Sequence, residues 1–220
     1  MRQLSDKGFL TLMGIIGNNT DLDALDPKMV QAAIRAPAET GQAFITWINA
    51  GCPVVEPIEI PRWRKISNTC IEVNLDAPLI PPFKGYKPVI WNQQSGWSRL
   101  ELRDDGELYR NDTKVELFLT EEQKTGFVRG HVVQRKLEGR ACLHPNELDA
   151  LMKNTHLGPT SWKRDYEGCV LRIFFWAVGF RVSNGLCVRC LCCDGGSWGL
   201  SYRWLDNHWA GQAPAAVLAS

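Results

Sequence analysis

Residues 185–209 read GLCVRCLCCDGGSWGLSYRWLDNHW, and their pattern decides how the C-terminal part of this chain folds. Two runs with strand character, 185–193 and 197–205, flank the pair Gly195-Gly196. Adjacent glycines between two such runs are typical of a tight turn. The segment therefore predicts two consecutive strands joined by a short glycine turn.

The second run separates its side chains by character. Strand alternation collects large apolar residues on one face, and these are Trp198, Leu200, Tyr202 and Trp204. The other face carries residues with no shared chemistry, namely Gly199, Ser201 and Arg203. Further on, Leu205 and Trp209 look like anchors among unrelated neighbours. Two interpretations remain open: an ordinary half-exposed sheet edge, or a binding surface whose frame and contacts are specified separately.

Four cysteines crowd into this segment: Cys187, Cys190, Cys192 and Cys193. Strand alternation places Cys187 and Cys193 on one face and Cys190 and Cys192 on the other. Thiolates on two faces cannot complete one tetrahedral zinc site. A disulfide between Cys187 and Cys190 would have to span roughly 10 Å. We therefore expect free thiols, no metal site and no cofactor.

The surrounding sequence predicts an α+β fold of antiparallel strands with two inserted helices. Residues 97–119 alternate between strands and the turn signals Asp105-Gly106 and Asn111-Asp112. Thr120 with Gln123 forms a capping box, and HPNELDALMKN (144–154) predicts the second helix. The run CVLRIFFWAVGFRV (169–182) reads as one strand before the cysteine-rich segment.

The N-terminal part has a different character. Residues 26–51 carry helical spacing and end at Gly51, whereas residues 53–88 are rich in proline and predict an extended connection. We therefore expect a small helical unit with its connection over residues 1–75, and the strand-rich domain over residues 76–220.

Charge and composition limit the classes of partner. The formal net charge is +1, with 45% hydrophobic residues, so no strong attraction to nucleic acid is expected. The apolar runs are too short for membrane insertion. The first residues do not resemble a secretion signal, so we expect a cytoplasmic or virion-associated protein.

Catalytic signatures do not emerge from the sequence. It contains no nucleophile elbow, phosphate-binding loop or dinucleotide fingerprint. His131, His144 and His156 lack acidic or cysteine partners at ligand spacing, so we expect surface or capping roles for them. The sequence thus predicts no catalytic residue and no enzyme.

Residues 173–220 closely resemble the C-terminal variable region of proteins diversified by diversity-generating retroelements. The matching anchors are Phe174, Phe175, Trp176, Gly185, Leu186, Val188, Arg189, Leu191, Gly196, Trp198, Tyr202, Trp204, Leu205, Trp209, Pro214, Ala215, Ala216, Ala219 and Ser220. A looser similarity, carried by EIPRWRKI and GWSRLELRDDGELYRNDTKVELFLTEEQ, extends it to about residues 56–220.

The resemblance implies a C-type lectin-like fold that displays a hypervariable surface for binding a protein or cell-surface ligand. In such systems a reverse transcriptase miscopies template adenines, so asparagine codons vary but never become tryptophan. The variable region would span about residues 174–220. Cys187, Cys190 and Cys193 are then products of varied codons. Gln212 departs from the pattern, because an asparagine codon cannot reach it, and calcium-binding sugar motifs are missing.

Two sets of residues follow from this interpretation. The aromatic frame is the expected scaffold: Phe175, Trp176, Trp198, Tyr202, Trp204 and Trp209. The displayed set is the expected ligand-binding surface: Cys190, Cys193, Ser197, Gly199, Ser201, Arg203, Asn207, His208, Ala210, Gly211 and Gln212. Two rival functions remain: an enzyme on the same fold, similar to formylglycine-generating enzymes that use a cysteine pair, and a zinc-stabilised structural module.

Overall fold

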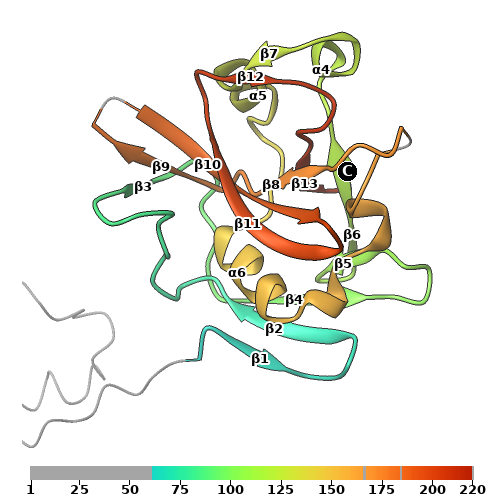
Figure 1. Ribbon diagram of the computed structural model, residues 1–220. Helices are drawn as coiled ribbons and strands as arrows, with labels where there is room; N and C mark the ends of the chain where they lie inside the picture. The colour runs from blue at the N-terminus through green and yellow to red at the C-terminus, as the bar shows by residue number, and fades with distance from the viewer. Residues whose placement is uncertain (1–60, 166, 184, 220) are drawn as a thin grey trace, which may run out of the picture. The chain divides into compact units, whose positions relative to one another are not determined.

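The structure is a computed structural model that describes residues 61–165, 167–183 and 185–219 (Figure 1). The chain divides into two units, Met1–Ile58 and Glu59–Ser220. All described residues belong to the second unit. The helices expected in the first fifty residues lie outside the described residues.

The second unit is mostly strands with few helices, which confirms the α+β class. Its strands are β1 (Trp63–Lys65), β2 (Cys70–Asn74), β3 (Lys87–Ile90), β4 (Trp97–Leu102), β5 (Leu108–Arg110), β6 (Thr113–Phe118), β7 (Val128–Arg129), β8 (Arg172–Phe174), β9 (Val178–Val182), β10 (Gly185–Asp194), β11 (Ser197–Trp204), β12 (His208–Trp209) and β13 (Ala215–Leu218). Its helices are α4 (Glu121–Thr125), α5 (Gly130–Lys136), α6 (Pro145–Lys153) and the short 3-10 helices η2 (Thr155–Leu157) and η3 (Thr160–Trp162). No helix among the described residues has the length and apolar character that a membrane span requires.

One large sheet organises the unit. Its strand order is β1-β2-β4-β5-β6-β13-β8-β10-β9-β3, and β11 pairs with β10 beside this path. A second, two-stranded sheet joins β12 to β7. The long strand β10 has β11 along one edge and β8 and β9 along the other. Because β10 has neighbours on both edges, it forms the middle of the region that carries the displayed set (Figure 1).

Local signals in the sequence account for several boundaries. Thr120 and Gln123 form the predicted capping box at the start of α4. Pro145 occupies the first turn of α6 after His144, which caps the helix through its ring nitrogen. The turn between β10 and β11 uses Gly195 and Gly196 at φ of +55° and +84°, a backbone region that favours glycine.

Two expectations about the elements are corrected by the structure. The single strand expected over residues 169–182 is two strands, β8 and β9, separated at residues 175–177. Between them, the backbone nitrogen of Phe175 donates to the Arg189 carbonyl at 3.1 Å, and that of Ala177 turns to the Leu143 carbonyl at 3.2 Å. Helix α5 is additional to the two predicted helices, and its segment GHVVQRK contains two valines, which are weak helix formers.

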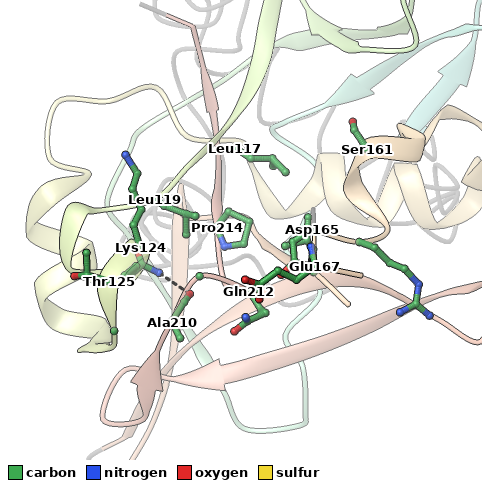
Figure 2. Close-up of a pocket in the computed structure, with 15 residues that line it drawn as sticks. Leu117, Leu119, Lys124, Thr125, Ser161, Asp165, Glu167, Ala210, Gln212 and Pro214 are labelled. Atoms are coloured by element: carbon green, nitrogen blue, oxygen red, sulfur yellow. Dashed lines mark hydrogen bonds between the residues drawn. The ribbon is translucent and has the colours of Figure 1, made fainter. Parts of the chain in front are cut away.

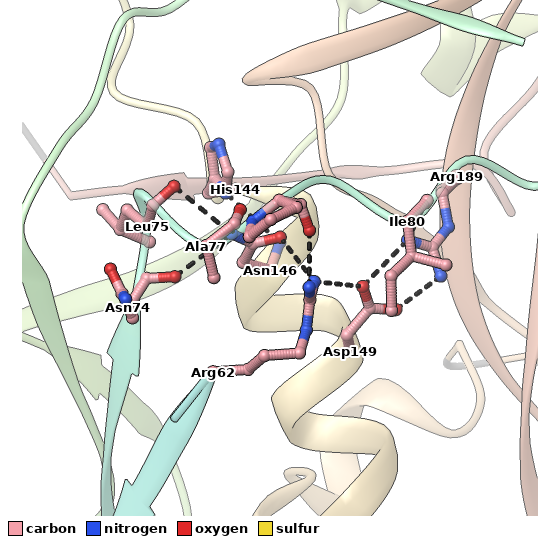
Figure 3. A network of polar contacts seen from close by, with 10 residues as sticks. Arg62, Asn74, Leu75, Ala77, Ile80, His144, Asn146, Asp149 and Arg189 are labelled. Atoms are coloured by element: carbon pink, nitrogen blue, oxygen red, sulfur yellow. Dashed lines mark hydrogen bonds and ion pairs between the residues drawn. The ribbon is translucent and has the colours of Figure 1, made fainter. Parts of the chain in front are cut away.

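The strand unit also begins before the expected residue 76. Asn146 of α6 donates from its side-chain amide to the carbonyls of Asn74, Leu75 and Ala77 at 2.8–3.2 Å (Figure 3). Strands β1 and β2 add pairing with β4. The proline-rich connection therefore does not extend to residue 75, since residues 63–74 are held by the sheet and by α6.

A buried ion pair fastens α6 to the middle of the sheet. Both Arg189 guanidinium termini donate to the Asp149 carboxylate, at 2.6 and 3.1 Å (Figure 3). The Arg189 side chain is only 5% exposed. Arg62 approaches the same carboxylate at 3.7 Å. Because removing one partner would leave a buried charge, this pair makes the contact between α6 and β10 specific.

Helix capping by His144 predicts a pH dependence of stability. Burial, with a further contribution from the charge of Arg110, lowers the pKa of His144 to about 4. The unfolded chain then binds a proton that the folded chain excludes, so stability falls as pH decreases from about 6.5 towards 4. The loss attributable to this ring is roughly 3 kcal/mol at its limit.

We expect His144→Asn, which keeps a capping acceptor without a titrating ring, to reduce this pH-dependent loss. Chemical denaturation at several pH values measures it, with His156→Asn as the exposed control. If the unfolding free energy of the wild type and of His144→Asn depended equally on pH, His144 would not be the group responsible.

Candidate functional site

The hairpin of β10 and β11 aligns the displayed residues with the cysteines. Gly199, Ser201 and Arg203 lie directly opposite Cys192, Cys190 and Val188. Directly opposed residues in an antiparallel pair share a face. On the other face, Trp198, Tyr202 and Trp204 lie opposite Cys193, Arg189 and Cys187. Two faces of distinct chemistry thus extend across both strands.

The aromatic frame is buried unevenly. Phe175, Trp176 and Trp209 are at most 2% exposed. The frame residues on β11 are half-buried, namely Trp198, Tyr202 and Trp204. Leu200, on the same face, is 45% exposed, so this face does not lie wholly in the core. Among the described residues, β11 pairs with β10 alone, and no core cluster includes Leu200.

The half-buried tryptophans pack closely against glycines. A Cβ at Gly185 would lie 2.5 Å from the Trp204 ring, and one at Gly158 would lie 2.7 Å from Trp198. Real side chains do not tolerate such distances, so each indole ring occupies the space that a side chain would fill. These contacts hold the edge strand in place although its outer surface is open.

The cysteines contradict their expected exposure. Cys187 and Cys190 are 0% exposed and Cys193 is 3% exposed, so Cys190 and Cys193 do not belong to the displayed surface. The physical reason is that β10 has strands on both edges and core clusters over both faces. Burial raises the pKa of Cys187 and of Cys190 to about 12. All described cysteines are free thiols.

The loop after β11, residues 205–214, combines the buried anchor Trp209 with exposed neighbours. Trp209 is fully buried, with its ring 4.3 Å from that of Phe174 and 5.0 Å from that of Trp176. Its indole nitrogen donates to the Trp204 carbonyl at 3.2 Å. A Cβ at Gly130 would lie 2.6 Å from that nitrogen, so α5 must begin with glycine there. The loop is therefore held rigidly at Trp209.

Residues on one side of Trp209 line an open hollow of about 370 Å³. Its lining is Arg129, Arg203, Asn207 and His208. His208 pairs across the small sheet with Arg129. The Arg203 guanidinium donates to the His208 carbonyl at 3.0 Å, and Arg129 donates to the Asp206 carbonyl. We call this feature the basic hollow.

Residues on the other side of Trp209 line a larger cavity of about 600 Å³ (Figure 2). Ala210, Gly211 and Gln212 form one wall, and α4 with residues 161–171 contributes to the others. Gln123 of α4 donates to the carbonyls of Ala210 and Ala213 at 3.4 and 3.0 Å. This loop cavity holds cations (Lys124, Arg164) and carboxylates (Asp165, Glu167), so its chemistry is mixed.

The displayed set thus falls into three groups. Asn207, His208, Ala210, Gly211 and Gln212 meet around Trp209, together with Arg203. Ser197, Gly199 and Ser201 lie along β11, where Ser197 is exposed and the other two are half-buried. Cys190 and Cys193 lie in the core. The structure therefore brings together the loop residues and Arg203, and separates them from the cysteines.

Several residues of this surface carried no sequence signal. Phe127 is 62% exposed and stacks on His208 with ring centroids 4.1 Å apart. Arg129 and Gln123 lie more than seventy residues before the loop, and only the pairing of β7 with β12 brings Arg129 there. Sequence spacing contains no information on such distant contacts.

Two residues of the loop cavity, Asp165 and Glu167, also belong to a group of potential metal ligands. Asp165, Glu167 and Cys169 are the one group of three within the described ranges whose ligand atoms lie within 4.8 Å of one another. The Asp165 carboxylate accepts from the backbone nitrogens of Glu167 and Cys169 at 3.0 and 2.8 Å. This turn-closing role accounts for the position of Asp165.

Compared with known protein families, with curated proteins and with solved structures, the chain has no match. The arrangement of strands and helices makes this an α+β protein with one large sheet. Its particular function has to be argued from the site itself.

The buried cysteines predict a stability cost for serine substitution. Cys187→Ser and Cys190→Ser each place a hydroxyl in the core, which costs about 1–3 kcal/mol without a good partner. Cys169→Ser is the control, because Cys169 is exposed and such changes usually cost within about 0.5 kcal/mol. Urea denaturation compares the three variants, and equal unfolding midpoints would contradict the burial of Cys187 and Cys190.

The frame predicts unequal roles for two tryptophans. Trp209→Ala should cost about 3–5 kcal/mol, as large core truncations do. Trp204→Ala should cost clearly less, because Trp204 is only half-buried. Thermal unfolding of both variants provides the comparison. A larger loss for Trp204→Ala would mean that the edge strand, and not the loop anchor, holds this region.

Proposed function

We propose that this protein is a ligand-binding display protein on a C-type lectin-like fold, whose C-terminal surface is diversified by adenine-directed mutagenic retrohoming. The observation that carries the proposal is the loop around Trp209. Its anchors Leu205 and Trp209 are fully buried, while Asn207 and His208 are exposed beside them. Such a loop can change its contact residues without changing its core.

The sequence resemblance supplies the diversification mechanism. Varied asparagine codons produce small and polar residues but never tryptophan. Accordingly, Arg203, Asn207 and His208 line the basic hollow, and Ala210 and Gly211 line the loop cavity, whereas tryptophan occupies the anchor position 209. Antiparallel strands with helices inserted before β8 support the C-type lectin-like fold.

The rival functions find less support at the cysteines. An enzyme of the formylglycine-generating kind would need two reactive cysteines close together, and a zinc module would need converging thiolates. In the hairpin, Cys187 lies opposite Trp204 and Cys190 opposite Ser201. The raised pKa values keep both sulfurs protonated at neutral pH. Metal analysis of the purified protein tests the zinc module, which requires stoichiometric zinc.

The diversification is tested at the gene. Its locus should contain a reverse transcriptase gene and a near-copy of the 3′ end of this gene that differs mainly at adenines. The differences should coincide with the codons of the loop and of Ser201 and Arg203, and avoid those of Trp209. A locus without such a copy would refute diversification.

Binding is tested with a variant of four contact residues. Replacing Ser201, Arg203, Asn207 and His208 together by other small or polar residues should preserve folding, because none is buried. Binding to a partner isolated with the wild-type protein should weaken at least about tenfold, since a few central contacts dominate most interfaces.

A matched control replaces Arg64, Ser67, Asn68 and His156, which are the same residue types on an exposed surface around β1 and η2. The control should bind like the wild type. Unchanged binding by the folded quadruple variant would place the ligand site elsewhere.

A further inference from the structure

The basic hollow is chemically one-sided. Its lining consists of two guanidinium groups, one imidazole and one amide, and no carboxylate lines it. Asp206, which precedes Asn207 in the sequence, directs its carboxylate to His131 at 3.4 Å. The hollow therefore presents hydrogen-bond donors and positive charge towards solvent.

Most of these donors are free to bind a ligand. A guanidinium has five N–H donors. Within the described part of the chain, Arg203 uses one terminus on the His208 carbonyl and Arg129 uses one on the Asp206 carbonyl. These bonds to backbone fix the direction of both side chains without neutralising them, because carbonyls carry no net charge.

A third cation adds to the field. Arg172 lies in line with Cys192 and Gly199 across three strands, on the face that carries Arg203. Burial, and then the charge of Arg172, lower the pKa of Arg203. Arg172 is exposed and has no acidic partner among the described residues. An anion would relieve this repulsion.

We infer that the basic hollow is an anion subsite that receives an acidic side chain, Asp or Glu, of a partner protein. This inference rests on the proposed function and names the chemistry of its ligand. The planar guanidinium forks of Arg129 and Arg203 match a carboxylate in geometry. Phe127, exposed and stacked on His208, adds an apolar rim that suits a protein surface.

A carboxylate is favoured over a nucleic acid by the distribution of charge. The chain has a net charge of only +1, and two guanidinium groups, those of Arg129 and Arg203, converge on one small hollow, whereas nucleic-acid binding typically uses an extended basic surface. The positions of the arginines in the sequence bear on how constant this charge is.

Arg129 and Arg172 precede the variable region expected over residues 174–220, whereas Arg203 lies inside it. The preference for an acidic partner would therefore persist through diversification.

The test uses the full chain and a fluorescein-labelled hexaglutamate peptide, with binding followed by fluorescence anisotropy. Arg203→Gln and Arg129→Gln should each weaken binding about tenfold, because each removes a charge-assisted contact. Raised salt should weaken binding by the wild type. The affinity of Arg203→Lys should lie between those of the wild type and Arg203→Gln, since lysine keeps the charge but lacks the planar guanidinium fork.

Arg64→Gln is the matched control, because it removes the same charge where Glu72 already accepts from Arg64 at 2.6 Å. It should bind hexaglutamate like the wild type. Near-ultraviolet circular dichroism verifies that Trp209 packs normally in each variant. Because β7 supplies Arg129 from outside the loop, that variant keeps the test valid if Arg203→Gln disturbs the loop.

Three results would overturn the inference: no binding of hexaglutamate, equal losses for Arg64→Gln and Arg203→Gln, or tighter binding of an oligothymidylate with the same arginine dependence. None of these would refute the display function, which depends on the gene locus and on the quadruple variant. Conversely, a locus without a template copy would leave the anion subsite intact.

Discussion

The burial of Trp209 is the contact on which the candidate surface depends. Its ring packs against Phe174 and Trp176, and its nitrogen holds the carbonyl of Trp204. Large apolar side chains buried in this way contribute several kcal/mol, far more than any exposed contact. Trp209, with Leu205, therefore holds the loop in place, and the exposed residues Asn207 and His208 can vary without changing the core.

The central strand β10 imposes the second constraint. Because core clusters cover both of its faces, most of its side chains are buried almost irrespective of their chemistry. Cysteine is among the small residues that such an environment accepts as apolar groups. The cysteine-rich segment is thus explained by packing, whereas the side chains of the neighbouring strand β11 are exposed or half-buried.

Charge and packing are divided between different parts of the fold. In the core, Arg189 is neutralised by Asp149, as a buried charge requires. Three arginines at the surface have no acidic partner within the described residues, and water solvates their charges: Arg129, Arg172 and Arg203. An arginine that is paired serves the fold, whereas one that is unpaired beside a rigid loop is available to a ligand.

The local features could be predicted from the sequence: the capping box at Thr120, the helix after His144, the glycine turn at 195–196 and the two faces of β11. These follow from residue types a few positions apart, where backbone conformation and alternation act directly. Exposure was a different matter. Alternation tells which side chains share a face but not whether another element covers that face.

Residue patterns did not predict that Cys190 and Cys193 are buried, that Leu200 is exposed, or that Arg129 lies beside Arg203. These outcomes depend on elements distant in the chain, such as the core clusters over both faces of β10 and the pairing of β7 with β12. Burial and convergence are properties of the assembled sheet, so residue patterns within one strand could not contain them.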